Sequence, residues 1–455
     1  MAAPFFVIIT LEEGIVVPAR ARRIARSYYP LAALLAAALV VRIALTPLWA
    51  YLPNNFSDEG CWKDWMQAIH QHGLLNVFRT ANTDYVGYQY VLWLLSGVYS
   101  AIGGSNYGHE VLRLHLLVKA PSVLFDMGLI IAMFAVSRSL FQEMHLPRPQ
   151  TLALIAAAVI AFQPAVLYDS AVWSQTDSAV TLAMLLALFF AIRGRPKWAF
   201  GIWAAGFLIK PHPIIILPLL LYLTWRRDAR ALLPGFATAA GVALIALAPW
   251  LIHGDGTQIA RIYRNLFDAD YQRLSAQAWN AWWFADLTLH PKPDQAVFVF
   301  VSYRMLGLLL TISTGFLALL YLHARANLRG SLVAAAYLAF AFYLLPVSTH
   351  DRYLYPFFAF MLPVTVAERR WRLMYALASV AFLFNLTVVA PPVHAFSGRW
   401  TGSPFTMGMA ALNCALFGVF TLEISRVALP SARVLLQRRF RRVRAVFGGL
   451  PDEAR

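Results

Sequence analysis

The chain has 455 residues, of which 60% are hydrophobic and only 13% are charged. A soluble protein of this length needs more polar surface than this composition supplies, so most of the chain is expected to lie in lipid. The formal net charge is +16, with arginine clusters before the first apolar span and after the last one. Such flanking clusters are what the positive-inside rule selects, so no nucleic acid partner is expected.

Apolar segments of about 20 residues recur along the chain, and each is long enough to cross a bilayer as a helix. We therefore predict an all-α polytopic transmembrane helical bundle of about 11 to 14 helices. Residues 30–425 are expected to form the membrane domain, between a basic N-terminal segment at 1–29 and a basic tail at 426–455. Because basic loops stay inside, both termini are expected on the cytoplasmic side, with outer loops at about 51–85 and 252–296.

Two features early in the chain bear on this topology. Trp62 and Trp65 belong to an amphipathic stretch of the first outer loop, which predicts a helix lying in the membrane interface. Between residues 103 and 138 the chain is expected to make two short crossings that meet near Lys119 and Pro121. One long helix there would invert the sides of the segments that follow.

Three acidic residues of the first outer loop are candidates for a catalytic base. Asp58 and Glu59 stand just before the interfacial helix, and Asp84 closes the loop ahead of Tyr85. Asp58 can cap the helix by accepting backbone N–H bonds, or it can take a proton from a substrate hydroxyl at the membrane surface. For Asp84 and Tyr85 the alternative is an interface anchor.

Charged residues inside or beside apolar spans cost free energy, so they are candidates for a site. Lys119 and Asp126 lie seven residues apart, close to one helical face, where they are expected to pair, either as a structural contact or beside a substrate. Lys210 and His212 alternate with two prolines that break a helix. This turn is therefore expected to face water or a cavity, where a cation suits a phosphate.

Two later segments complete the set of candidates. His350, Asp351 and Arg352 stand between two apolar runs, where the arginine either snorkels at a helix end or grips an anionic headgroup. The second outer loop carries Asn280 and Trp282 in a tryptophan-rich stretch. Indole rings there serve either as interface anchors or as a stacking surface for a sugar.

Taken in order, these motifs resemble those of the type C glycosyltransferases, polytopic enzymes that use a lipid-linked sugar donor. The resemblance runs from about Ser57 to Pro363 and is closest for bacterial relatives of the mannosyltransferase that adds the second mannose of glycosylphosphatidylinositol. It rests on Asp58; Asp84-Tyr85-Val86-Gly87-Tyr88; Gln163-Pro164; Trp173-Ser174-Gln175-Thr176-Asp177; Lys210-Pro211-His212; Asn280-Ala281-Trp282; and His350-Asp351-Arg352-Tyr353. That group has Trp-Gly-Gln-x-Asp, His-Glu-Arg-Tyr and two prolines after Asp-Tyr, so the departures here leave the sugar and the acceptor open.

The resemblance implies an inverting glycosyltransferase that moves a hexose, with mannose as one candidate, from a polyprenyl-phosphate sugar to a glycan or glycolipid acceptor at the outer face of a bacterial inner (plasma) membrane. Asp58 is the expected base, with Glu59 and Asp84 as alternatives. The other expected roles are donor phosphate binding by Lys210, His212, His350 and Arg352, and substrate positioning by Lys119, Asp169, Gln175, Asp177, Asn280 and Trp282. No cofactor is expected, and a divalent metal is not favoured because no dense carboxylate cluster demands one.

Two other functions also want cations near an outer vestibule. One is a transporter or flippase of lipid-linked saccharides, which predicts internal repeats and polar residues along the middle of several spans; neither is seen in the sequence. The other is a glycan ligase or polymerase that takes a diphosphate-linked donor. These functions are distinguished by whether a sugar is transferred and by the phosphate of the donor.

Overall fold

The computed structural model of the protein is mostly helical, with a few short strands. The predicted all-α bundle is confirmed. The structure describes residues 19–51, 58–81, 83–109, 111–265, 273–396 and 402–447. Parts of the two predicted outer loops and the ends of both basic terminal segments lie outside these ranges.

The α-helices are α1 (Ala19–Leu45), α2 (Asp58–His72), α3 (Val77–Thr80), α4 (Tyr88–Ala101), α5 (Leu112–Glu143), α6 (Pro149–Phe162), α7 (Pro164–Leu167), α8 (Asp177–Ile192), α9 (Pro196–Ile209), α10 (Leu217–Arg227), α11 (Leu232–Ile252), α12 (Gly256–Asn265), α13 (Trp283–Thr288), α14 (Tyr303–Ala324), α15 (Leu328–Leu344), α16 (Tyr355–Ala367), α17 (Arg372–Val389) and α18 (Pro404–Phe447). The strands are β1 (Ser275–Ala276), β2 (Ala296–Phe298), β3 (Val301–Ser302) and β4 (Thr349–His350). β1 pairs with β4 in parallel, and β2 pairs with β3 antiparallel.

Among the described helices, six are long and apolar enough to cross a bilayer by themselves, namely α1, α5, α11, α14, α17 and α18. α6 and the segment of α7 and η3 (Tyr168–Val172) form a further pair, bent by 50°. The predicted number of 11 to 14 helices is larger because it includes shorter apolar helices such as α8 and α15, which are below the length of an independent span. These shorter helices are largely buried inside the bundle, whereas α11 and α14 leave most of their apolar side chains open to lipid.

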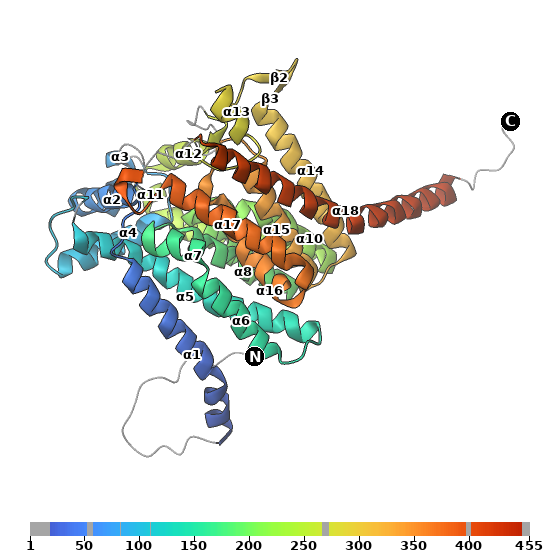
Figure 1. Cartoon of the computed structure of the whole chain (residues 1–455), viewed down its shortest axis with the longest axis horizontal. Helices are drawn as coiled ribbons and strands as arrows, with labels where there is room; N and C mark the ends of the chain where they lie inside the picture. The colour runs from blue at the N-terminus through green and yellow to red at the C-terminus, as the bar shows by residue number, and fades with distance from the viewer. Residues whose placement is uncertain are drawn as a thin grey trace.

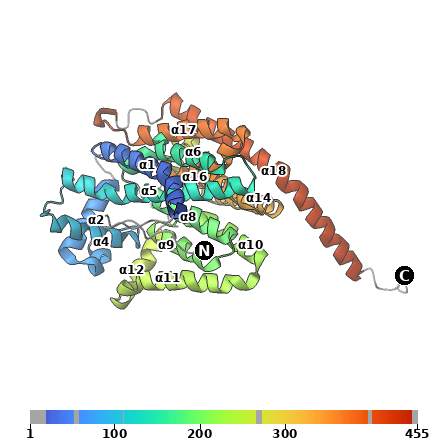
Figure 2. The same ribbon diagram turned by 90° about the horizontal axis from the view of Figure 1, so that it is seen from below.

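The segment between α1 and α5 forms a separate layer at one end of the bundle. α2, α3 and α4 pack on one another and on the start of α5 around a core of aromatic side chains, and both views show α2 and α4 together on the side of the molecule away from the C-terminus (Figures 1 and 2). α4 has only 14 residues and leaves Trp93 and Leu94 exposed. It therefore lies along this end of the bundle. The sequence instead predicted a span after the outer loop that ends at about residue 85.

The prediction of two short crossings between residues 103 and 138 is wrong. α5 is one helix of 32 residues that runs through the buried Pro121. A proline inside a membrane helix is tolerated when packed neighbours satisfy the freed backbone groups. The expected inversion of the later segments does not follow, because α4 does not cross and α5 alone carries the chain to the other end.

The alternation of the remaining helices separates polar turns from basic loops. α8 begins at Asp177 and α9 ends one residue before Lys210, so both residues lie at the same end of this packed helix pair. α15 ends before the His350–Arg352 turn, and α16 begins just after it. The arginine-rich turns at residues 193–197, 226–230, 325–329 and 369–372 all fall at the opposite end. The structure thus groups the two kinds of turn as the charge pattern predicted.

Candidate functional site

An acid from the start of α2 meets an arginine nearly 300 residues later in the chain. Asp58 is the first residue of α2, and its Oδ2 atom lies 3.3 Å from Nη2 of Arg352. The same oxygen accepts a 2.6 Å hydrogen bond from Nε2 of Gln175. The Asp58 side chain is 24% exposed and that of Arg352 is 8% exposed. Asp58 is therefore held by two partners from the bundle while part of its carboxylate stays open.

A second ion pair lies directly beside the first. Nζ of Lys210 donates to both carboxylate oxygens of Asp177, at 2.9 and 3.0 Å. The Asp177 carboxylate also lies 3.9 Å from Nε of Arg352, which links the two pairs. Pro211 follows Lys210 at the end of α9, where the backbone of the lysine turns extended and continuation of the helix is blocked. Two buried cations thus lie in one cluster with three carboxylates, counting Asp351 at 3.4 Å from Nη1 of Arg352.

The turn between η3 and α8 aims Gln175 at Asp58. Ser174 takes a left-handed backbone conformation with φ of 65°, which L-residues adopt only at some cost and which favours glycine. Next to it, the Trp173 ring centre lies 5.6 Å from Cζ of Arg352. The turn therefore places an amide donor and an aromatic face around the same acid and guanidinium.

Asp169 is the least satisfied carboxylate of the site. It lies on the π-helical turn η3, has no exposed surface, and neither of its carboxylate oxygens has a hydrogen-bond partner among the described residues. The charges of Asp177, Lys210 and Arg352 act on it through space. A π-helical turn displaces side chains from the regular helical register and is common at functional sites. Its carboxylate therefore keeps unused hydrogen-bond acceptors inside the protein.

The two histidines of the site gather around Tyr353. The His212 ring centre lies 4.1 Å from that of Tyr353 in an edge-to-face arrangement, and the His350 ring lies at 5.2 Å. Burial, and then the positive charges of Lys210 and Arg352, hold the pKa of His212 well below its usual value. The pKa of His350 is also lowered, first by burial. The sequence grouped both histidines with the cations, but the lowered pKa of each favours its neutral form.

The two alternative bases have different surroundings. Glu59 is buried, and its Oε1 atom lies 2.5 Å from Nζ of Lys63 and 2.6 Å from Nδ1 of His115. Burial by itself would raise the pKa of Glu59, but the bonds to His115 and Lys63 outweigh it and lower that pKa. Asp84 is exposed in the loop before α4, where desolvation by the surrounding protein and then the charge of Asp58 raise its pKa. Glu59 therefore joins α2 to α5, whereas Asp84 stands close to Asp58.

Residues 111–292 match the sequence model of Glycosyltransferase family 87. This family-87 segment is less than half of the chain, and it contains Asp169, Gln175, Asp177 and Lys210. Asp58 and Arg352 lie outside it. No curated protein matches the sequence.

Two solved structures are similar over most of the chain. One is the crystal structure of ArnT from Cupriavidus metallidurans bound to undecaprenyl phosphate, with 14% identity, a TM-score of 0.48, and coverage of 87% of this chain and 76% of that chain. The other is ArnT from the same organism in the apo state, with 14% identity, a TM-score of 0.49, and coverage of 90% and 78%.

Within the family-87 segment, the predicted pairing of Lys119 with Asp126 is wrong. Nζ of Lys119 donates to the carbonyl oxygens of Thr46 and Leu48 just after α1, at 3.0 and 2.5 Å. Asp126 instead accepts a 2.6 Å bond from Nε of Arg42, and both side chains of that pair are fully buried. Seven residues are about two turns, so the two α5 side chains lie on nearly the same face but about 10 Å apart along the helix axis, and each contacts a different neighbour. Arg42, a charge within the first apolar span, was the signal that sequence analysis overlooked.

The Arg42–Asp126 pair binds two elements that carry residues of the site. Ser170, next to Asp169 on η3, donates a 2.5 Å bond to Oδ2 of Asp126. The Tyr355 hydroxyl donates to its other oxygen at 3.4 Å. A buried charge with this many donors fixes the elements that supply them. The pair therefore fixes η3, which carries Asp169, and the start of α16, which follows Arg352.

Asn280 and Trp282 hydrogen-bond to the segment that precedes Arg352. They are the last two residues of the family-87 segment for which the sequence predicted a role. Nδ2 of Asn280 donates to the Thr349 hydroxyl at 2.6 Å, and its Oδ1 accepts from the Trp282 backbone at 3.0 Å. Nε1 of Trp282 donates to the carbonyl oxygen of Leu345 at 2.7 Å. Their polar groups thus position β4 and the turn behind it. In the described ranges, no group of three or more His, Cys, Asp or Glu side chains is arranged to hold a metal ion.

Proposed function

We propose that this integral membrane protein is an inverting glycosyltransferase that moves a hexose from a polyprenyl-phosphate donor to a hydroxyl of a glycan or glycolipid. The observation that carries the proposal is the 3.3 Å approach of Asp58 to Arg352, beside the Lys210–Asp177 pair. The match of residues 111–292 to Glycosyltransferase family 87 supports sugar transfer as the reaction. Mannose is the sugar that the motif resemblance offers.

Asp58 acts as the general base. It is the partly open carboxylate at the mouth of the cluster, and Gln175 and Arg352 hold it in one orientation. A positioned carboxylate can take the proton of an acceptor hydroxyl as that oxygen attacks the anomeric carbon. Attack from the face opposite the phosphate inverts the configuration. Glu59 cannot take this role without breaking its bonds to Lys63 and His115.

Arg352 and Lys210 bind and neutralise the phosphate that leaves. A guanidinium offers two parallel N–H donors to a phosphate, and a lysine adds a point charge. Charge that develops on a lipid phosphate is stabilised most by cations already held in place, as both are here by Asp177. Neutral His212 and His350 add hydrogen bonds but no positive charge. Asp169 and Gln175 bind hydroxyls of the sugar or acceptor.

The balance of charge at the site predicts proton uptake with the donor. Asp58, Asp177 and Asp351 all contact Arg352, so carboxylates outnumber cations before any phosphate arrives. Burial, opposed by the charge of Arg352, raises the pKa of Asp351 to about 7. An anionic donor raises it further, since like charges favour the protonated acid. Donor binding is therefore stronger below pH 7 than above it.

The direct test uses protein reconstituted in liposomes with polyprenyl-phosphate sugars and membrane glycolipid extracts. Asp58→Asn retains the size of the side chain and is expected to lower the transfer rate by about 10²- to 10⁴-fold. The matched control is Asp64→Asn on the same helix, whose carboxylate is 59% exposed and contacts His109. It is expected to retain activity within about twofold, in line with a contact at the surface. Near-normal transfer by Asp58→Asn overturns the assignment of the base.

The alternative functions give different results in the same liposomes. A flippase moves a labelled lipid-linked saccharide between leaflets without transferring its sugar, and Asp58→Asn need not slow that movement. A glycan ligase or polymerase uses a diphosphate-linked donor in preference to a monophosphate. We propose that the site faces the outer side of the bacterial inner membrane, with both termini in the cytoplasm. Protease or cysteine-labelling access to the α2–α4 layer in spheroplasts tests that orientation.

A further inference from the structure

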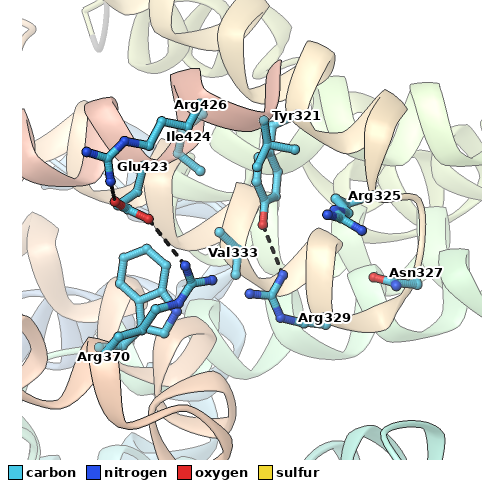
Figure 3. A pocket seen from close by; sticks show the side chains of 11 residues that line it. Tyr321, Arg325, Asn327, Arg329, Val333, Arg370, Glu423, Ile424 and Arg426 are labelled. Carbon is cyan, nitrogen blue, oxygen red and sulfur yellow. Dashed lines mark hydrogen bonds and ion pairs between the residues drawn. The ribbon is translucent and has the colours of Figure 1, made fainter. Parts of the chain in front are cut away.

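A basic cavity lies at the end of the bundle opposite Asp58. It has a volume of about 540 Å³ and lies where the end of α14, the start of α15, the turn before α17 and the middle of α18 meet. The polar residues that line it are Tyr321, Arg325, Asn327, Arg329, Arg370, Glu423 and Arg426. Figure 3 shows Arg329 bonded to the Tyr321 hydroxyl and, beside it, Arg370 bonded to Glu423. No step of the proposed transfer reaction uses these residues.

The helices between the two sites give their separation. α15 begins at Leu328 beside Arg329 and ends shortly before Arg352, while α16 returns from Tyr355 to the Arg370 turn. With 17 and 13 residues, these helices span roughly 20 to 25 Å at 1.5 Å per residue. That distance approaches the thickness of a bilayer core. The cavity therefore lies at the level of the opposite leaflet.

The cavity holds more positive charge than its acids neutralise. Arg329 donates to both carboxylate oxygens of Glu368, and Arg370 bridges Glu368 and Glu423 at 3.0 and 3.3 Å. Arg426 contacts Glu423 and is 73% exposed. The Arg325 side chain has no hydrogen bond or ion pair with another described residue. Four guanidinium groups thus face two carboxylates. Arg325 has no acid partner among the described residues, and Arg426 uses Nη1 on Glu423, which leaves its other N–H groups for a ligand.

The rest of the lining is apolar and continues into the lipid-facing surface. Val333, Trp371, Ile424 and Val427 complete the walls. α14 and α18, which flank the cavity, leave most of their apolar side chains outside the protein core. Both views show α18 leaving the bundle toward the C-terminus (Figures 1 and 2). A ligand with a charged head and apolar chains matches this surface, whereas a small soluble anion uses only its arginines.

We propose that this cavity binds the phosphate group of an anionic phospholipid of the inner leaflet, with the acyl chains against α14 and α18. Arg325 and Arg426 donate to the phosphate, while Arg329 and Arg370 stay in their carboxylate bridges and hold the walls. Basic pockets between membrane helices on the cytoplasmic side suit anionic headgroups, and arginine suits phosphate because its donors form a planar fork. The inference is independent of the reaction at Asp58.

The test compares lipid binding by full-length protein in a neutral detergent, measured by native mass spectrometry and by thermal unfolding. Wild type is expected to bind phosphatidylglycerol at least about tenfold more tightly than phosphatidylcholine, equal to ~1.4 kcal/mol. The variant Arg325→Gln/Arg426→Gln is expected to lose this preference. It leaves both Glu368 bridges intact. The matched control, Arg195→Gln/Lys197→Gln, removes the same charge from exposed positions on another basic turn and is expected to retain the preference.

Three outcomes overturn the inference. The first is equal binding of the two lipids by wild type. The second is an equal loss in the control variant, which would mean that net charge and not the cavity selects the lipid. The third is full replacement of phosphatidylglycerol stabilisation by inorganic phosphate at the same phosphate concentration, which would assign the cavity to a soluble anion.

Discussion

Replacing Arg42 by methionine removes the cation from a fully buried ion pair while keeping an unbranched apolar stem. The change deletes the 2.6 Å bond from Nε to Asp126 and two bonds from Nη1 to backbone carbonyls, at 3.0 Å to Ala161 and 3.2 Å to Ala38. Asp126 is then left with its hydroxyl donors and no opposite charge. Removing one partner of a buried pair costs about 3 to 5 kcal/mol, mostly because the other charge stays buried.

Equilibrium unfolding by SDS in mixed micelles, followed by tryptophan fluorescence, measures this loss. The control is Arg304→Met, which breaks a 2.7 Å pair with Asp294 whose side chains are 35% and 74% exposed. An exposed pair contributes at most about 1 kcal/mol. The double variant Arg42→Met/Asp126→Leu is expected to recover at least half of the loss, because no unpaired charge remains. If Arg42→Met is no more costly than Arg304→Met, the argument from burial is refuted.

Three further predictions concern the polar end of the bundle. Burial raises the pKa of Asp351 to about 7. The stability that its protonated form provides is therefore complete below the ordinary carboxyl pKa and is lost as the pH rises through 7. Between pH 5.5 and pH 8.5, the free energy of unfolding of wild type should fall by on the order of a few kcal/mol relative to that of Asp351→Asn. Ser174→Gly relieves the left-handed φ of 65° and should raise the free energy of unfolding by about 0.5 to 1 kcal/mol, with transfer activity retained. An unchanged or lower unfolding midpoint would contradict backbone strain at residue 174. Glu59→Gln breaks the ion pairs to Lys63 and His115 and should lower the free energy of unfolding by about 3 kcal/mol near neutral pH. Because the pKa of Glu59 is lowered in the folded protein, this stability is present above the ordinary carboxyl pKa. It is lost as the pH falls through the pKa of Glu59 in the folded protein. Transfer should stay within about tenfold of wild type, and a loss like that of Asp58→Asn would instead make Glu59 a base.

Several features of the site could be predicted from sequence because they depend on local cost. A charge beside an apolar span is expensive wherever the helix packs, so Asp58, Lys210 and Arg352 stand out without any knowledge of the fold. The prolines around Lys210 signal a helix end, and the structure places one there. The basic turns fall at one end for the same reason, since each short helix must return the chain to the side where its loop charges are stable.

Other features depend on how helices rotate and pack, which periodicity does not contain. Composition and spacing predict a polytopic helical bundle with acids and cations in its polar turns. The packing of the helices sets the rest: Arg42, and not Lys119, pairs with Asp126, and α4 lies along the bundle. For the same reason Glu59 pairs with Lys63, while its neighbour Asp58 faces Arg352. Adjacent residues on a helix point in directions about 100° apart, so their partners come from different helices, whose positions only the assembled bundle fixes.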